Sequence, residues 1–295
     1  MSNSGNRQTK NEKREAAREK ARQLREEQQK KEKRTKLLLQ GGILVAVLAV
    51  VAVVALVIVN SVRPPSPGPL NMASDGVQVN AGKVVTPTPA LQPGELPVAN
   101  DAQEGKLDIR IYVDYLCPFC KLMEDTNGEY IESLVQNGAA TLEVHPVAFL
   151  DRFSQGTKYA TRAANAVACV VNYSPANFYD FHMSLFENQP AENTRGLDNG
   201  TLWQLASESG VTDAAVQSCI NNREFEGWVT DASARAANGP LLGTELPAVT
   251  GTPTTLINGV QYPGHPGDAA AFRAFVVQSE AAATPQPEPT PTPSS

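Results

Sequence analysis

The sequence predicts an α/β domain with a helical insertion, preceded by a single transmembrane helix. Two strand-like segments flank a C-x-x-C motif within residues 107–147, a long helical section occupies 156–238, and two short strands and a helix follow. Ahead of the domain, the 23 residues 37–59 carry no charged side chain. About 180 residues lie outside polar or Pro-rich stretches, which suits one domain with an insertion.

Charge is distributed unevenly along the chain. Of 25 Lys+Arg and 31 Asp+Glu residues, the first 36 residues hold 13 and 6, so that the arm 1–36 is basic and the rest is acidic. Because the arm ends directly at an apolar run, we expect it to lie against anionic lipid headgroups. The acidic remainder argues against nucleic-acid binding by the domain.

The apolar run 37–59 predicts a membrane anchor. At ~1.5 Å per residue, 23 helical residues span a hydrocarbon core of ~30 Å. Lys33, Arg34 and Lys36 crowd its N-terminal flank, whereas Arg63 stands alone on the other side. The positive-inside rule then predicts a single-pass protein of the cell membrane, with a cytoplasmic N-terminus and an extracytoplasmic domain. The alternative is a cleaved signal peptide, but the run is long and no convincing small-x-small site follows it.

The parts outside the membrane fall into three predicted regions. Pro-rich residues 60–100 are expected to form an extracytoplasmic spacer, with four valines between 77 and 85 indicating a short strand. The folded domain is expected to cover 101–280. The Pro/Thr-rich end, 281–295, is expected to be disordered.

Within the domain, hydrophobic periodicity defines the elements. Residues 107–113 alternate apolar and polar side chains, which is the period of a strand, and 141–147 repeat the pattern. Two strands within 254–262 flank an Asn-Gly turn, and a helix near 267–280 closes the domain. The helices expected in the insertion are 157–172, 176–187, 200–208, 213–221 and 224–237.

The motif Cys117-Pro118-Phe119-Cys120 lies at a strand-to-helix junction. Unpaired N–H groups and the dipole at a helix N-terminus favour a thiolate, and Pro118 fits the first helical position. Cys120 falls one turn along, within disulfide reach. We therefore expect Cys117 to be an exposed attacking thiolate and Cys120 a buried resolving thiol, with no bound cofactor.

Two plainer interpretations of the motif compete with redox chemistry. A zinc site would need further ligands, yet Cys169, Cys219, His145, His182 and His265 are single and widely spaced, so no metal site is expected. A purely structural disulfide between cysteines three residues apart would close too small a loop to add much stability.

The motif after an apolar strand, the helical insertion and Gly251-Thr252-Pro253-Thr254 before a strand resemble the DsbA-like thioredoxin family. More closely, the chain resembles the membrane-anchored DsbA-like thiol–disulfide oxidoreductases of Gram-positive bacteria, over about residues 100–280. The resemblance implies a thioredoxin-like core with an inserted helical subdomain. It also implies that Pro253 is cis and faces the redox pair, and that Thr252 presents backbone groups to a substrate in a groove.

The chain departs from that family at two places. Phe119 stands where strongly oxidising DsbA proteins have histidine, and a neutral ring gives a thiolate less electrostatic support. Thioredoxins carry a buried acid six residues before the first cysteine, where this chain has Ile111. The nearest acid, Asp114, is interpreted as a solvated strand-end carboxylate rather than a proton relay.

Cys169 and Cys219 both fall in the helical insertion. In an exported domain they are expected to form a structural disulfide. Its loop of about 50 residues contributes on the order of 4 kcal/mol in the chain-entropy model. The alternatives are two free buried thiols or a second redox relay.

These observations predict an oxidoreductase that exchanges disulfides with exported cysteine-containing proteins, oxidising them through a Cys117 mixed disulfide that Cys120 resolves. By the resemblance, a quinone-linked membrane oxidase reoxidises the pair. A reductase of exported thiols, as in cytochrome maturation, is the first alternative. A non-catalytic envelope binding module on the same scaffold is the second.

Overall fold

The computed structural model describes residues 14, 15, 18–22, 25, 30, 31, 50, 67–100 and 103–283. The chain divides into two units, residues 1–64 and 65–295. The described residues of the first unit are helical and exposed. Among the described residues, no helix is long and apolar enough to cross a membrane. The predicted membrane helix, 37–59, lies outside them except for Val50.

The second unit is built on one six-stranded sheet with the strand order β2-β1-β4-β3-β5-β6. β3 and β4 are parallel, and all other neighbouring pairs are antiparallel. β3 and β4 match the predicted strands 107–113 and 141–147 to within a residue. The strands are β1 (Val77–Asn80), β2 (Val84–Val85), β3 (Leu107–Val113), β4 (Ala140–Pro146), β5 (Thr254–Ile257) and β6 (Val260–Gln261).

Five helices between β4 and β5 form the expected insertion, and each lies within two residues of its predicted bounds. Two of them begin at aspartate caps, since Asp198 accepts from Thr201 N and Asp213 from Ala215 N. The helices are α2 (Pro118–Gln136), α3 (Tyr159–Tyr173), α4 (Phe178–Glu187), α5 (Asn199–Glu208), α6 (Ala214–Asn222), α7 (Glu226–Asn238) and α8 (Ala269–Ala283). Short 3-10 turns occur at η1 (Ala81–Lys83), η2 (Asp151–Phe153) and η3 (Pro175–Asn177).

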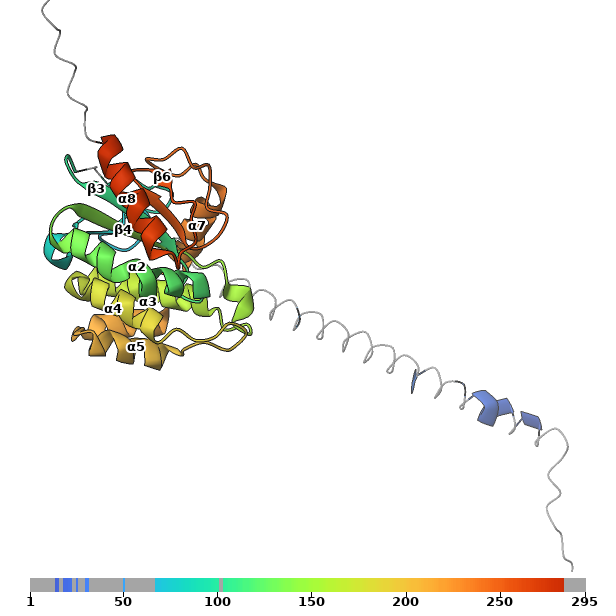
Figure 1. Ribbon diagram of the computed structural model, residues 1–295. Coiled ribbons are helices and arrows are strands. Elements are labelled where there is room, and N and C mark those ends of the chain that lie inside the picture. The colour runs from blue at the N-terminus through green and yellow to red at the C-terminus, as the bar shows by residue number, and fades with distance from the viewer. Residues whose placement is uncertain are drawn as a thin grey trace, which may run out of the picture. The chain divides into compact units, whose positions relative to one another are not determined.

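Side-chain alternation along β3 divides the buried residues between two cores. Ile109 and Ile111 point to the face of the sheet that α2 covers, where α8 packs beside α2 (Figure 1). Tyr112 points to the other face and packs with Leu241 and Leu256. Because both faces are covered, nearly the whole of β3 is buried.

Helix α3 is the centre of the helical insertion. Every residue from Tyr159 to Val171 is buried, and the helix contacts α4, α5, α6 and α7. Its many alanines let neighbouring helices approach closely. A disulfide joins Cys169 of α3 to Cys219 of α6.

Residues 67–100 differ from the predicted spacer. β1 pairs antiparallel with β4, and Val77 and Val79 are fully buried. Farther along, Val98 N donates to Ala73 O at 2.8 Å. The spacer interpretation is wrong for this stretch, because β4 has a free edge and an apolar face that β1 completes. At the other end, α8 continues to Ala283, so residues 281–283 of the predicted tail are helical and the rest lies outside the described residues.

Candidate active site

The C-x-x-C motif lies where β3 passes into α2. Cys117 is the N-cap residue, with extended backbone (φ −77°, ψ 117°), and Pro118 occupies the start of the helix. Cys120 N donates to Cys117 O at 3.1 Å. The two thiols are not bonded to each other. The Cys117 sulfur is thus placed at the positive end of a 19-residue helix.

The surroundings separate the two thiols by acidity. A hydrogen bond from the Cys120 side chain lowers the pKa of Cys117 to about 6, against the effect of burial and with help from Thr252 and the N–H groups of Cys120 and Phe119. Burial raises the pKa of Cys120 well above its ordinary value. At neutral pH, Cys117 is therefore mostly a thiolate and Cys120 a thiol.

Cys117 is less exposed than expected for an attacking thiol. It is 5% exposed, and Cys120 is fully buried. The loop before β5 covers the first sulfur, since Cys117 Sγ lies 3.1 Å from Thr252 O. The Thr252–Pro253 peptide bond is cis, and both residues are half-buried. The structure therefore brings Thr252 and Pro253 to the redox pair, as the resemblance implied.

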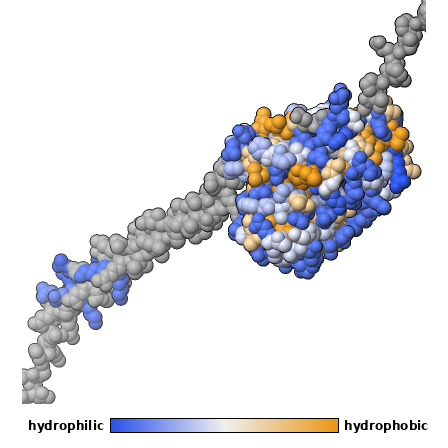
Figure 2. Space-filling view, turned by 90° about the vertical axis from the view of Figure 1, so that its left-hand side faces the viewer, coloured by the Kyte–Doolittle hydropathy of each residue, from blue (hydrophilic) through white to orange (hydrophobic). Residues whose placement is uncertain are grey.

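Phe119 is exposed beside the reactive sulfur. Its side chain is 54% exposed, and its ring meets the His265 ring edge-on at 6.0 Å between centroids. In Figure 2, apolar residues lie among hydrophilic ones on the face shown. An exposed aromatic side chain beside the reactive sulfur offers apolar contact area to a substrate segment.

Asp114 is fully buried, so its interpretation as a solvated strand-end carboxylate is wrong. Its Oδ1 accepts from Leu116 N, and its Oδ2 accepts from Phe149 N and Leu150 N at 2.8 and 2.9 Å. Burial, with a smaller effect from the charge of Cys117, raises its pKa to about 7 despite these hydrogen bonds. Asp114 thus ties the motif to the loop after β4 and exchanges a proton near neutral pH.

Gln189 holds the motif from the opposite side, in the loop after α4. Its Nε2 donates to Tyr115 O at 3.2 Å and to Cys117 O at 3.0 Å. Sequence reasoning missed this residue, because 72 positions separate it from Cys117 and no local pattern marks it.

A buried polar chain also links the motif to the helical insertion. Tyr115 Oη lies 2.8 Å from His182 Nδ1, and His182 Nε2 lies 3.4 Å from Glu124 Oε1. His182 lies in the interior and is 1% exposed. The hydrogen bond to His182 thus holds Tyr115, two positions before Cys117, against α4.

Cys169 and Cys219 are separate from this chemistry. Their disulfide lies inside the helical insertion, and both residues are buried. Among the residues that the structure describes, no group of three or more His, Cys, Asp or Glu side chains is arranged to hold a metal ion.

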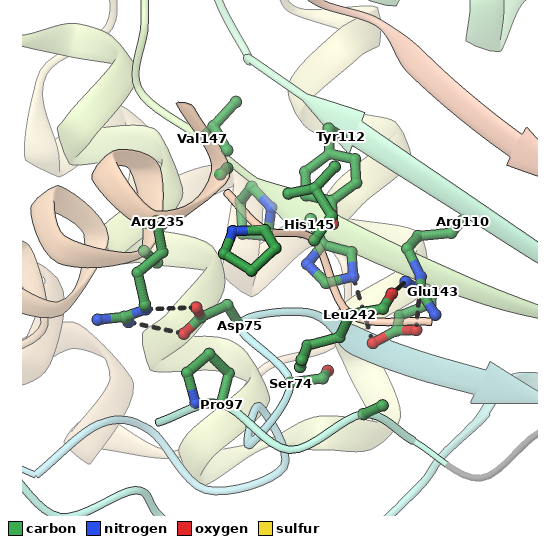
Figure 3. A pocket seen from close by; sticks show the side chains of 16 residues that line it. Ser74, Asp75, Pro97, Arg110, Tyr112, Glu143, His145, Val147, Arg235 and Leu242 are labelled. Atoms are coloured by element: carbon green, nitrogen blue, oxygen red, sulfur yellow. Dashed lines mark hydrogen bonds and ion pairs between the residues drawn. The ribbon is translucent and has the colours of Figure 1, made fainter. Parts of the chain in front are cut away.

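A second polar cluster occupies the face of the sheet opposite α2 (Figure 3). Arg110 Nε lies 3.2 Å from Glu143 Oε2, and His145 Nε2 lies 3.2 Å from Glu143 Oε1. Burial opposes ionisation of Glu143, yet His145 and Arg110 outweigh it and hold its pKa at about 2. Arg235 of α7 pairs with Asp75 at 2.6 Å. The Arg235–Asp75 pair fastens the segment before β1 to α7, and the other two pairs join β3 to β4 and hold Glu143 within β4.

A family model described as thioredoxin matches residues 102–277. Among solved structures, the reduced form of a disulfide bond oxidoreductase (DsbG) from Mycobacterium tuberculosis is 32% identical, with a TM-score of 0.53 over 72% of this chain and 93% of that one. Reduced DsbA from the same organism is 31% identical, with a TM-score of 0.50 over 71% of this chain and 100% of that one.

The MdbA thiol-disulfide oxidoreductase from Corynebacterium diphtheriae is 16% identical, with a TM-score of 0.53 over 74% of this chain and 95% of that one, a likeness of fold alone. No curated protein sequence matches the chain. The match to the family model covers the strand, the C-x-x-C motif and the cis-proline loop together.

Proposed function

Because the chain belongs to the thioredoxin family and is an oxidoreductase, we propose that it introduces disulfides into exported cysteine-containing proteins. The proposal rests on one observation. The Cys117 sulfur lies at a helix N-terminus and its pKa is lowered to about 6, and it lies next to the buried thiol of Cys120 and the half-buried loop at Thr252. This is the arrangement that thiol–disulfide exchange requires.

Each turnover begins from the oxidised pair. A substrate thiolate attacks Cys117 Sγ, the Cys117–Cys120 bond breaks, and Cys120 leaves with the electron pair and takes up a proton. A second substrate thiolate then attacks the substrate sulfur of the mixed disulfide and expels Cys117 as a thiolate. Two substrate thiols are oxidised and the enzyme disulfide is reduced, so the balance closes. In the reverse direction, Cys117 attacks and Cys120 resolves.

The lowered pKa of Cys117 favours the oxidising direction. A thiolate that is stabilised in the reduced enzyme is a good leaving group, and it makes the oxidised form the stronger oxidant. Phe119 favours the reductase alternative, because its neutral ring gives the thiolate no charge support. The reduction potential decides between them: a value well above that of thioredoxin, roughly −270 mV, supports the oxidase and a value near it supports the reductase.

The location belongs to the same proposal. We assign the apolar run 37–59 as a membrane anchor, with the basic arm in the cytoplasm and the domain outside, where a membrane redox partner reoxidises the pair. The Cys169–Cys219 disulfide supports an oxidising compartment. External protease on intact spheroplasts should release a soluble domain. Protection of the domain from that protease would refute the topology.

The activity itself is tested by oxidation of a dithiol peptide with the full-length protein. The wild-type protein should oxidise the peptide catalytically when an external oxidant regenerates the pair, and Cys117→Ser should not. Equal peptide oxidation by the two proteins would leave only a binding module on a thioredoxin scaffold and would end the proposal.

A further inference from the structure

A basic pocket with a volume of about 470 Å³ opens between the starts of α3 and α5. Four cationic side chains line it, from three separate parts of the helical insertion: Lys158, Arg162, Arg195 and Arg223. Two acids, Asp198 and Glu226, line it as well. The pocket is distinct from the redox site and shares no residue with it.

Arg162 forms the floor of this pocket and is 5% exposed. Its Nε donates to Thr157 O at 3.0 Å, its Nη1 donates to Asn199 Oδ1 at 3.2 Å, and its Nη2 donates to Arg195 O at 3.4 Å. All three acceptors are neutral. A guanidinium has five N–H donors, so these bonds fix its plane and leave donors over.

Positive charge in the pocket is not balanced by its acids. Asp198 caps α5 through Thr201, and Glu226 lies 3.8 Å from Arg223. Within the described parts of the chain, no carboxylate lies within 4.0 Å of Lys158, Arg162 or Arg195. Burial lowers the pKa of Arg162, and the nearby charge of Arg223 lowers it further, against weaker support from Asp198.

The helix starts beside the pocket do not add to this charge. At the start of α3, Thr161 N donates to Asp151 Oδ1 at 3.0 Å. At the start of α5, Thr201 N donates to Asp198 Oδ1 at 2.8 Å. A carboxylate therefore already caps each helix N-terminus, and the positive charge of the pocket comes from its lysine and arginine side chains.

We propose that this pocket is an oxyanion-binding site for a phosphate group. The planar guanidinium of arginine matches the geometry and charge of phosphate oxygens, and the lysine ammonium adds positive charge beside it. The cavity is larger than a single phosphate needs, so the group can arrive free or as the phosphodiester of a larger molecule. The domain as a whole is acidic, so general attraction between opposite charges does not account for anion binding there.

The test is isothermal titration calorimetry of the full-length protein with inorganic phosphate and, separately, with glycerophosphoglycerol, at constant ionic strength set with chloride. The pocket variant is Lys158→Gln with Arg195→Gln. Both side chains are exposed, and Arg195 supplies the Arg162 bond through its carbonyl, which the substitution keeps. Loss of each charge-assisted contact should weaken binding roughly tenfold.

The matched control is Arg152→Gln with Arg273→Gln. It removes two exposed arginines that stack on Phe153 and Tyr130, outside the pocket. The control should bind phosphate with the affinity of the wild type. Any binding of phosphate by the basic arm 1–36 is the same in every variant, so it does not affect the comparison. If only inorganic phosphate binds and the pocket variant weakens that binding, the ligand is a free anion. If glycerophosphoglycerol binds as tightly as inorganic phosphate and the pocket variant weakens both, the ligand is a phosphodiester of the headgroup type. If neither ligand loses affinity in the pocket variant, or if the control loses as much, the site does not exist.

Discussion

The chain contains two pairs of buried cysteines that differ in almost every other respect. Cys117 and Cys120 are three residues apart at the start of α2 and carry free thiols. Cys169 and Cys219 are 50 residues apart, lie within α3 and α6, and are joined by a disulfide. Burial is shared, so burial does not determine reactivity. A helix N-terminus, a neighbouring thiol donor and a substrate-facing loop belong to the first pair alone.

The sharpest test of this comparison is loss of activity. Cys117→Ser should abolish peptide oxidation and form no mixed disulfides. Cys120→Ser should instead trap substrate disulfides covalently, since the Cys117 thiolate still attacks them and the Cys120 thiol that resolves the mixed disulfide in this direction is missing. Non-reducing gels with mass identification of the linked cysteine measure both outcomes. Trapping by the Cys117 variant rather than by the Cys120 variant would reverse the two roles.

Alkylation rates sharpen the difference between the two thiols of the reactive pair. The thiolate of Cys117 forms as the pH rises through about 6, whereas Cys120 stays protonated beyond its ordinary pKa. At pH 7, Cys117 should therefore react with iodoacetamide at least about a hundredfold faster than Cys120, measured by mass spectrometry of quenched samples.

Two substitutions at Cys120 provide the control for that pKa. The hydrogen bond from Cys120 is the largest cause of the lowered pKa of Cys117. Cys120→Ala should thus raise the alkylation midpoint of Cys117, and Cys120→Ser, which keeps a donor, should raise it less. Equal midpoints in the two variants would show that the helix terminus sets the pKa without the second thiol.

Removal of the other pair should affect stability rather than chemistry. The double variant Cys169→Ala and Cys219→Ala opens a loop of 50 residues, which costs on the order of 4 kcal/mol of unfolding free energy. Denaturant unfolding should show this loss, while the reduction potential of the Cys117–Cys120 pair stays unchanged. A shifted potential would couple the two pairs and support a redox relay instead.

Local patterns predicted the elements well, because strand and helix periodicities are properties of neighbouring residues. The motif's chemistry was predictable for the same reason, since Cys117, Pro118 and Cys120 are within one helical turn. The cis state of Pro253 came only from a family resemblance. The contact of the preceding residue, Thr252, with Cys117 spans 135 residues of chain, which local patterns do not report.

The errors arose where distant segments meet. The short strand predicted between 77 and 85 is confirmed as β1 and β2, but it was placed in a spacer because proline surrounds it. Its pairing with β4 is a long-range contact that the local sequence does not reveal. Asp114 was taken as solvated because strand ends are usually exposed, whereas the loop containing Phe149 and Leu150 closes over it. Gln189 and the Arg162 pocket have no local signature at all.

The smallest effect expected is the pH dependence contributed by Asp114. Its pKa is raised to about 7 when folded, compared with an ordinary value of 3.8, so between these values the folded state holds a proton that the unfolded chain has released. Stability should fall as the pH rises toward 7, by roughly 3 kcal/mol between pH 5 and 8. Asp114→Asn should remove this slope, as measured by urea unfolding at several pH values. The amide keeps only one acceptor oxygen, so the variant also loses hydrogen bonds to Leu116 N or to the loop after β4, which lowers its stability equally at every pH. An unchanged slope in the variant would show that Asp114 is ionised in the folded protein at pH 5 and does not exchange a proton near the redox pair.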